Sequence, residues 1–345
     1  MSLYALARPL LFALEPERAH HLAFAALKAL PARPARHDER LAVEVAGLAF
    51  PSPIGLAAGL DKDALAPDAF LTLGFGFVEV GTLTPLPQAG NPRPRLFRLA
   101  EDAAIINRMG FNNRGQAAAF ERLRARAGRP GIVGVNIGAN KDAADRIADY
   151  AAGVARMAPV ADYLTINISS PNTPGLRALQ GEAALDSLLE AAMAKRPAGG
   201  PPIFLKVAPD LEPADVDAIA RVAIERGVDA LIVSNTTISR PMLRSAYAGE
   251  SGGLSGAPLK ALALQRLRDF RTATGGALPL IAAGGIGSGA DAYARIKAGA
   301  SLVQLYSALI YEGPLLARRI ERELLALMRT EGHQSLRSAI GSDCA

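Results

Sequence analysis

Residues 161–175, ADYLTINISSPNTPG, combine a buried strand with a polar turn. The run from Tyr163 to Ile168 carries no charge and is rich in β-branched and aliphatic side chains, which is typical of a strand covered on both faces. The chain then turns through two serines, two prolines and a glycine. Two amides and two hydroxyls therefore gather at the carboxyl end of one strand: Asn167, Asn172, Ser169 and Ser170.

This group of amides and hydroxyls suits a planar, polar small molecule, because amides can hydrogen bond to its edges. Ser170, fixed next to Pro171 and shielded from water, could move a proton of that molecule. The alternative is purely structural: a proline-rich connection whose hydroxyl groups cap the helix that follows.

Apolar, strand-like runs recur along the chain, and helical stretches lie between most of them. The strand-like runs are 53–59, 76–83, 131–138, 162–168, 203–208, 229–235, 278–285 and 301–307, and the predicted helices are 116–127, 143–157, 182–195, 213–226, 259–273, 290–298 and 314–331. This alternation predicts an α/β fold, a (β/α)8 TIM barrel, with a doubly wound open sheet as the alternative. The longest irregular piece, 84–113, is expected to form loops over the barrel mouth.

Two short apolar segments, 3–14 and 18–30, precede the barrel and are predicted to form a small N-terminal helical hairpin. Each is too short to span a bilayer, and charges such as Arg8 and Arg18 interrupt the apolar run that a signal peptide requires. We divide the chain into the helical segment 1–40 and the barrel 41–345. The hairpin fits either packing against the barrel alone or additional contact with a membrane surface.

The composition excludes several classes of function. The net charge is only +5, without a basic run, so no nucleic-acid partner is expected. The single cysteine, Cys344, lies next to the C-terminus, which rules out a disulfide framework and a CxxC metal site and fits a reducing compartment. No HExxH or similar spacing occurs, and we expect no metal.

The ends of the last two strand-like runs point to a phosphate group. The segment 283–288, AGGIGS, ends the seventh run and opens a helix, so bare backbone N–H groups can face an anion there. Tyr306 and Ser307 end the eighth run, and barrels commonly hold phosphate at these two loops. Lys206 lies mid-strand among apolar residues and requires an anionic partner, which leaves open a Schiff-base lysine, a fixed cation beside a cofactor ring or a structural lysine.

Long motifs in the sequence closely resemble the dihydroorotate dehydrogenase family. They are NISSPNTPG at 167–175, GLDK at 59–62, NRMGFNN at 107–113, LKVAPD at 205–210 and GGLSG at 252–256, together with PERAH at 16–20. The resemblance runs from about Leu14 to Gly341. A serine in the place of the catalytic base and the N-terminal hairpin resemble the membrane-associated, quinone-reducing class. The soluble classes typically place a cysteine there.

The resemblance implies a flavin cofactor, FMN, and dihydroorotate as the substrate, with Ser170 as the catalytic base. The implied cofactor-binding residues are Ala58, Gly59, Leu60, Asp61, Lys62, Thr82, Asn136, Asn167, Lys206, Ser234, Gly256, Gly285, Tyr306 and Ser307. The implied substrate-binding residues are Lys62, Asn107, Arg108, Met109, Gly110, Phe111, Asn167, Asn172, Asn235 and Thr236.

The resemblance also implies that electrons pass to ubiquinone or menaquinone through a slot between the hairpin and the flavin. Arg98 and His20 are candidates for its polar lining, and Leu10, Leu11 and Leu22 for its apolar walls. We expect a monomer, attached peripherally to the cytoplasmic face of the inner membrane and acting in pyrimidine biosynthesis. Three rival functions stay open: a phosphosugar isomerase or aldolase using Lys206, a non-catalytic membrane adaptor, and a soluble fumarate- or NAD-linked enzyme.

Overall fold

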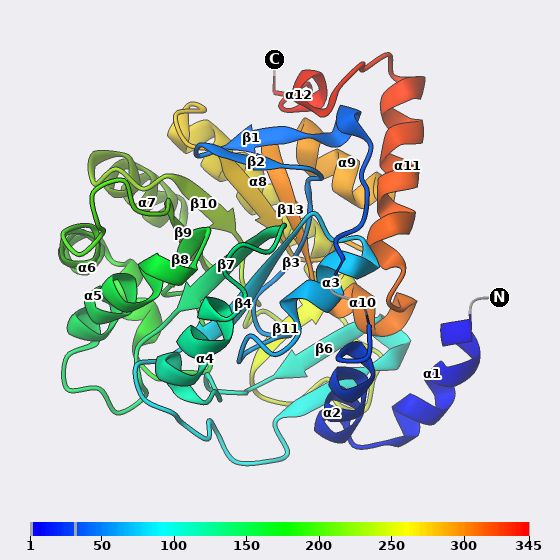
Figure 1. Cartoon of the computed structure of the whole chain (residues 1–345), viewed down its shortest axis with the longest axis horizontal. Coiled ribbons are helices and arrows are strands. Elements are labelled where there is room, and N and C mark those ends of the chain that lie inside the picture. Colours follow the sequence, from blue (N-terminus) through cyan, green and yellow to red (C-terminus); the bar gives the residue numbers. More distant parts are fainter. Residues whose placement is uncertain (1–2, 31–32, 345) are drawn as a thin grey trace.

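The computed structural model describes residues 3–30 and 33–344. Its centre is a closed barrel of parallel strands, hydrogen bonded in the order β10-β12-β13-β3-β4-β7-β8-β9 (Figure 1). These strands are β3 (Ile54–Leu56), β4 (Phe77–Leu83), β7 (Ile132–Ile137), β8 (Tyr163–Asn167), β9 (Ile203–Val207), β10 (Ala230–Val233), β12 (Leu280–Ala283) and β13 (Ala300–Leu305). Each corresponds to one predicted run, so the predicted TIM barrel is confirmed and the doubly wound sheet is wrong.

Aromatic rings fill the barrel interior at the amino ends of the strands, because small residues face them. A Cβ atom added to Gly55 would lie 2.1 Å from the ring of Phe77, and one added to Gly134 would lie 2.0 Å from the ring of Tyr163. This alternation of large and small side chains makes the interior a packed core rather than a pore.

A β-hairpin that the sequence analysis did not predict, β1 (Val43–Val45) with β2 (Leu48–Phe50), closes this end of the barrel. The ring of Phe50 packs edge-on against that of Phe77, with centroids 5.0 Å apart. Figure 1 shows β1 and β2 at the opposite end of the barrel from the N-terminal helices. The mouth therefore lies at the carboxyl ends of the strands.

Helices cover the outside of the barrel. The seven predicted helices are present as α4 (Gly115–Arg124), α5 (Arg146–Met157), α6 (Glu182–Met193), α7 (Pro213–Glu225), α8 (Lys260–Thr274), α9 (Gly289–Lys297) and α11 (Leu316–Thr330). The structure adds α3 (Pro67–Leu73), α10 (Ser307–Glu312) and α12 (Leu336–Ala339). Each added helix is shorter than two full turns, too short for a sequence periodicity to reveal.

The prediction that residues 84–113 form only loops is wrong. This segment contains β5 (Leu96–Leu99) and β6 (Ala104–Asn107), which pair with each other, and β6 also pairs with the distant β11 (Gly253–Gly256) in an antiparallel sheet. The sheet lies on the mouth side of the barrel (Figure 1). Because the partner strand is almost 150 residues away in the chain, the local pattern did not predict this pairing.

The two predicted N-terminal helices are present as α1 (Leu3–Ala13) and α2 (Pro16–Leu27). Glu15 caps α2 by accepting hydrogen bonds from the backbone N–H groups of Glu17 and Arg18. The side chain of Glu17, only 6% exposed, pairs with Arg95 at 2.7 Å and with Arg93 at 2.8 Å. This buried pair ties α2 to the segment that leads into β5.

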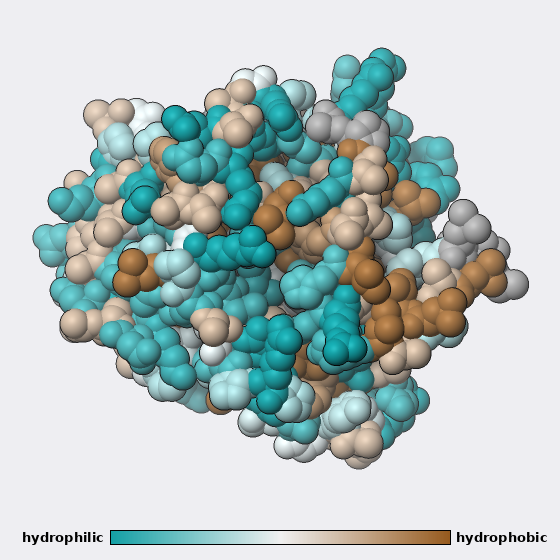
Figure 2. Space-filling model, turned by 60° about the horizontal axis from the view of Figure 1, so that its bottom comes forward, coloured by the Kyte–Doolittle hydropathy of each residue, from teal (hydrophilic) through white to brown (hydrophobic). Residues whose placement is uncertain are grey.

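The hairpin exposes more apolar surface than a packed element requires. Leu6, Leu10 and Leu22 are 64%, 76% and 56% exposed. Figure 2 shows apolar side chains gathered on the side of the molecule where the hairpin lies. Within the described residues, no helix is both long and apolar enough to cross a membrane. The division at residue 40 stays a prediction, and its residues 1, 2, 31 and 32 lie outside the described part of the chain.

Candidate active site

A cavity of about 420 Å³ opens at the carboxyl ends of the barrel strands. It brings together Ser170 and most of the predicted binding residues. Those that line it are Ala58, Gly59, Lys62, Thr82, Asn107, Met109, Gly110, Phe111, Asn167, Asn172, Lys206, Ser234, Asn235, Thr236, Gly256, Gly285, Tyr306 and Ser307. Their individual roles as ligand contacts stay predictions.

Four predicted binding residues do not line the cavity. Leu60 packs into the apolar core, and the buried carboxylate of Asp61 accepts hydrogen bonds from the N–H groups of Leu65 and Ala66 at the start of α3. The Arg108 guanidinium turns away to Glu250, at 2.6 Å. Asn136 lies behind two of the lining residues, Thr82 and Asn167, and its side-chain oxygen accepts a hydrogen bond from each.

A buried carboxylate that the sequence analysis missed organises the floor of the cavity. Glu79, on β4, is fully buried and accepts four hydrogen bonds. The donors are Asn136 at 2.7 Å, Gln304 at 2.7 Å, Tyr163 at 3.1 Å and Thr165 at 3.2 Å. The sequence did contain a signal for Glu79, because its charge lies within the apolar run from Phe77 to Val80. A charge within an apolar run is also what identified Lys206.

Glu79 fixes the orientation of two site amides. An ionised carboxylate can only accept, so Asn136 must direct its NH₂ group to Glu79 and its oxygen to the opposite side. That oxygen accepts hydrogen bonds from Thr82 at 2.6 Å and from Asn167 at 3.1 Å. Because the Asn136 oxygen accepts, the group that Asn167 directs to it must be its NH₂ group. The side-chain oxygen of Asn167 accepts a hydrogen bond from the Ser169 hydroxyl at 2.9 Å.

Lys206 extends from β9 beside Asn167 of β8 and is 5% exposed. Burial lowers the pKa of its ammonium group, while the negative charge of Glu79 acts in the opposite direction. Within the described residues, no side chain or backbone oxygen accepts a hydrogen bond from the Lys206 Nζ atom. A buried ammonium group on a cavity wall without an acceptor requires a ligand that supplies one.

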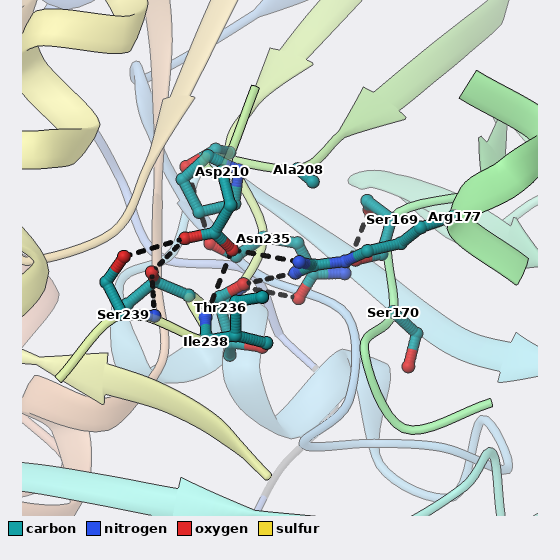
Figure 3. Close-up of polar contacts among 12 residues, drawn as sticks. Ser169, Ser170, Arg177, Ala208, Asp210, Asn235, Thr236, Ile238 and Ser239 are labelled. Carbon is teal, nitrogen blue, oxygen red and sulfur yellow. Dashed lines mark hydrogen bonds and ion pairs between the residues drawn. The ribbon is translucent and has the colours of Figure 1, made fainter. Parts of the chain in front are cut away.

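The ion pair between Arg177 and Asp210 holds the loop that carries Ser170. Arg177 pairs with Asp210 at 2.9 Å and donates hydrogen bonds to the backbone oxygens of Ser169 at 3.0 Å and Thr236 at 2.9 Å. Figure 3 shows this cluster, with the Ser170 side chain directed away from it. The Ser170 hydroxyl lines the cavity and accepts a hydrogen bond from the N–H of Asn172 at 3.2 Å.

The glycine-rich turn after β12 forms part of the cavity wall, which Gly284, Gly285 and Ile286 line. Gly284 and Gly285 both have a positive φ, of 108° and 68°, which favours glycine. A Cβ atom at Gly285 would also lie 2.4 Å from the Cα atom of Lys260. In the described part of the chain, the N–H groups of Gly285 and Ile286 have no hydrogen-bond partner. Such bare N–H groups are what a phosphate site requires, and the phosphate at this turn stays a prediction.

The hairpin lies close to one residue of the cavity wall, Lys62, whose charge acts on His20 of α2. Burial, together with the nearby charge of Lys62, lowers the pKa of His20 to about 3, so His20 is neutral at physiological pH. Burial also lowers the pKa of Lys62 to about 8. Arg98 holds the end of α1 by donating hydrogen bonds to the backbone oxygens of Leu11 at 3.1 Å and Phe12 at 3.0 Å, and its place in a slot stays a prediction.

Comparisons with known proteins agree with this geometry. A family model described as dihydroorotate dehydrogenase matches residues 40–328. The chain belongs to the dihydroorotate dehydrogenase family. It is 64% identical to a protein of Erythrobacter litoralis named dihydroorotate dehydrogenase (quinone), over 99% of this chain and 100% of that protein. A protein of Sphingopyxis alaskensis with the same name is also 64% identical, over 98% of this chain and 96% of its own length.

Solved dihydroorotate dehydrogenase structures share the fold. The ligand-free enzyme of Eimeria tenella superposes with a TM-score of 0.90 at 47% identity, over 95% of this chain and 99% of that one. The complex of that enzyme with ferulenol gives the same TM-score at 46% identity, over 95% of each chain. As a member of the dihydroorotate dehydrogenase family, the protein is an oxidoreductase enzyme.

The dihydroorotate dehydrogenase family depends on a flavin, and the polar groups of this cavity fit one. The Lys206 ammonium group lacks an acceptor, and the buried Oε1 atom of Gln304, also on the cavity wall, lacks a donor. The ring of a flavin offers both acceptors and an imide N–H. The free N–H groups of Gly285 and Ile286 suit a phosphate.

Proposed function

We propose that this protein oxidises (S)-dihydroorotate to orotate with FMN as its cofactor and passes the electrons to a membrane quinone, as a step of pyrimidine (UMP) biosynthesis. The observation that supports this most strongly is the placement of Ser170 in one cavity with four amides, Asn107, Asn167, Asn172 and Asn235. Amides match the imide edges of dihydroorotate, and a serine among them is placed to act on a proton.

FMN, when bound, supplies the acceptor for the hydride that leaves C6 of dihydroorotate. Lys206 and Gln304, with Thr82 and Asn167, would hold its ring, and the turn at Gly285 would hold its phosphate. The positive charge of Lys206 favours negative charge that develops on the neighbouring ring.

Ser170 removes the proton from C5 of dihydroorotate as the general base, while Lys62 binds the substrate carboxylate. A serine hydroxyl is a weak base, so its proton needs a route to solvent. Thr173, three residues on and 4% exposed, is the candidate for that relay. The N–H of Asn172, which donates to Ser170 Oγ, would stabilise that oxygen as it loses its proton.

The hairpin would form the quinone access and the membrane contact, at the cytoplasmic face of the inner membrane. Its exposed leucines supply the apolar face that a peripheral membrane protein requires. The ring of His20 lies 4.6 Å from that of Phe24, and the charge of Lys62, on the cavity wall, acts on His20. The quinone species and the monomeric state stay predictions.

Acceptor specificity tests the function. The purified protein should be yellow, release FMN on heating and oxidise dihydroorotate with decylubiquinone much faster than with fumarate or NAD⁺. A colourless protein that forms a borohydride-trapped adduct at Lys206 would support the aldolase alternative. A protein that binds neither flavin nor dihydroorotate would support the adaptor.

We expect dihydroorotate binding to weaken above pH 8. The Lys62 ammonium group is charged below its pKa of about 8 and loses that charge as the pH rises through it. The KM for dihydroorotate should therefore rise, by up to about tenfold per pH unit. Lys62→Arg should remove this rise, since a guanidinium stays charged. A wild-type KM that stays flat to pH 9.5 would contradict the assignment of Lys62 to the carboxylate.

We expect that replacing the exposed hairpin leucines by charged residues weakens membrane binding and leaves the oxidation of dihydroorotate unchanged. Replacing Leu6, Leu10 and Leu22 by aspartate should lower binding to anionic vesicles by at least about tenfold, because each fully buried leucine contributes about 1.5–3 kcal/mol. Oxidation of dihydroorotate by a water-soluble dye should be unchanged. Ile224→Asp is the matched control, since Ile224 is 41% exposed on α7. If the triple variant and the control bound vesicles equally, the hairpin would have no role in membrane binding and would only pack against the barrel.

A further inference from the structure

Arg295, on α9, is a fully buried cation without a paired anion. Its side chain is 1% exposed, and burial lowers the pKa of its guanidinium to about 10, still well above neutral pH. Within the described residues, no carboxylate lies within ion-pair distance of it, and its Nε atom has no hydrogen-bond partner. The other buried arginine of the described residues, Arg95, is paired with Glu17, and the half-buried Arg126 is paired with Asp68. An unpaired buried charge is costly, which indicates that an anion belongs nearby.

The contacts of Arg295 place that anion at the glycine-rich turn. Its Nη2 atom donates hydrogen bonds to the backbone oxygens of Lys260 at 2.7 Å and Gly284 at 3.3 Å. In a trans peptide group the C=O and the next N–H point in opposite directions. Because the Gly284 oxygen turns inward to Arg295, the N–H of Gly285 turns toward the cavity that both glycines line.

The neighbouring charged groups do not neutralise Arg295. The charge of Asp291, the nearest acid along α9, acts on Arg295 from a distance but forms no ion pair with it: Asp291 accepts from Lys260 Nζ at 2.7 Å and from the N–H of Gly287 at 3.0 Å. Arg319 holds the Gly287 oxygen at 3.0 Å, but it is already paired with Glu312 at 2.8 Å. Arg295 is thus the one arginine at this turn whose charge is left for a ligand, among the residues that the structure describes.

We propose that Arg295 is a positioning residue for the cofactor phosphate. It lies behind the glycine-rich turn, where it orients the N–H of Gly285 toward the phosphate and supplies a positive charge that no ion pair neutralises. This inference rests on the proposed use of FMN, whose phosphate is the anion. It assigns to Arg295 the preference for FMN over riboflavin, since the two flavins differ only in that phosphate.

The ratio of FMN affinity to riboflavin affinity tests this role. Full-length protein freed of flavin is titrated with each flavin, and binding is followed by quenching of flavin fluorescence. Arg295→Met should weaken FMN binding by about 10- to 100-fold and riboflavin binding by less than about threefold. Arg126→Met is the control: it removes a half-buried arginine that holds Asp68 and the oxygens of Pro130 and Gly131, away from the cavity lining, and should leave the ratio unchanged.

If Arg295→Met does not fold, Arg295→Gln tests the same role. Glutamine keeps a donor for the backbone oxygens and removes only the charge, and the loss should again be confined to FMN. A wild-type ratio in whichever variant folds would overturn the role of Arg295, as would equal losses for both flavins. A wild-type protein that binds no FMN would instead overturn the proposed function.

Discussion

Ser170→Ala is expected to lower turnover by about 10²- to 10⁴-fold, the usual contribution of a general base. The FMN content should be unchanged, because the Ser170 hydroxyl accepts only the N–H of Asn172 and takes no part in the hydrogen-bond network around Glu79. Stopped-flow reduction of the flavin by dihydroorotate measures the affected step directly.

Ser170→Cys is the control for this prediction. A thiolate can also accept the proton, so the cysteine variant should keep part of the activity that the alanine variant loses. If the flavin of Ser170→Ala protein were reduced at the wild-type rate, the base would have to be another group.

Lys206→Met is expected to weaken FMN retention by about tenfold or more and to make the bound flavin harder to reduce. The variant leaves the fully buried Glu79 without the nearby positive charge that Lys206 supplies, and it removes the fixed charge beside the ring. The flavin-to-protein ratio after gel filtration and the reduction potential in a dye-coupled titration measure the two effects.

Glu79→Gln provides the complementary variant. It should also weaken FMN binding, because the NH₂ group that replaces one carboxylate oxygen cannot accept, so the hydrogen bond from either Asn136 or Gln304 is lost. Since it removes the opposite charge, it should shift the potential in the other direction. Lys206→Met protein that keeps its flavin and its potential would rule out a cofactor role for Lys206.

The barrel could be predicted from sequence because its signals are local. Each strand is a short apolar run that ends in turn residues, and each main helix is long enough to show its period. The position of the site could also be predicted from local signals, because the strands of a barrel bring their carboxyl ends together. Ser170 and the glycine-rich turn come just after strands and Lys206 lies near the carboxyl end of β9, and the structure places all three on one cavity.

The residues that the sequence analysis missed act through long-range contacts. Glu79 meets Gln304, 225 residues away, and Arg177 meets Asp210 from the next strand unit. Arg295 lies on an ordinary helix, where a charge usually faces solvent. Asp61 and Arg108, in contrast, belong to motifs of the family but are used for capping and for an ion pair. A motif identifies a segment and does not establish which of its side chains reach the ligand.

Sequential anaerobic mixing tests the central claim most directly. The yellow protein is mixed first with dihydroorotate and then with decylubiquinone, and flavin absorbance is followed throughout. We predict that dihydroorotate bleaches the flavin, that orotate forms in a one-to-one ratio with it, and that the quinone restores the colour. A flavin that dihydroorotate leaves oxidised, or one that the quinone cannot reoxidise after bleaching, would contradict the account.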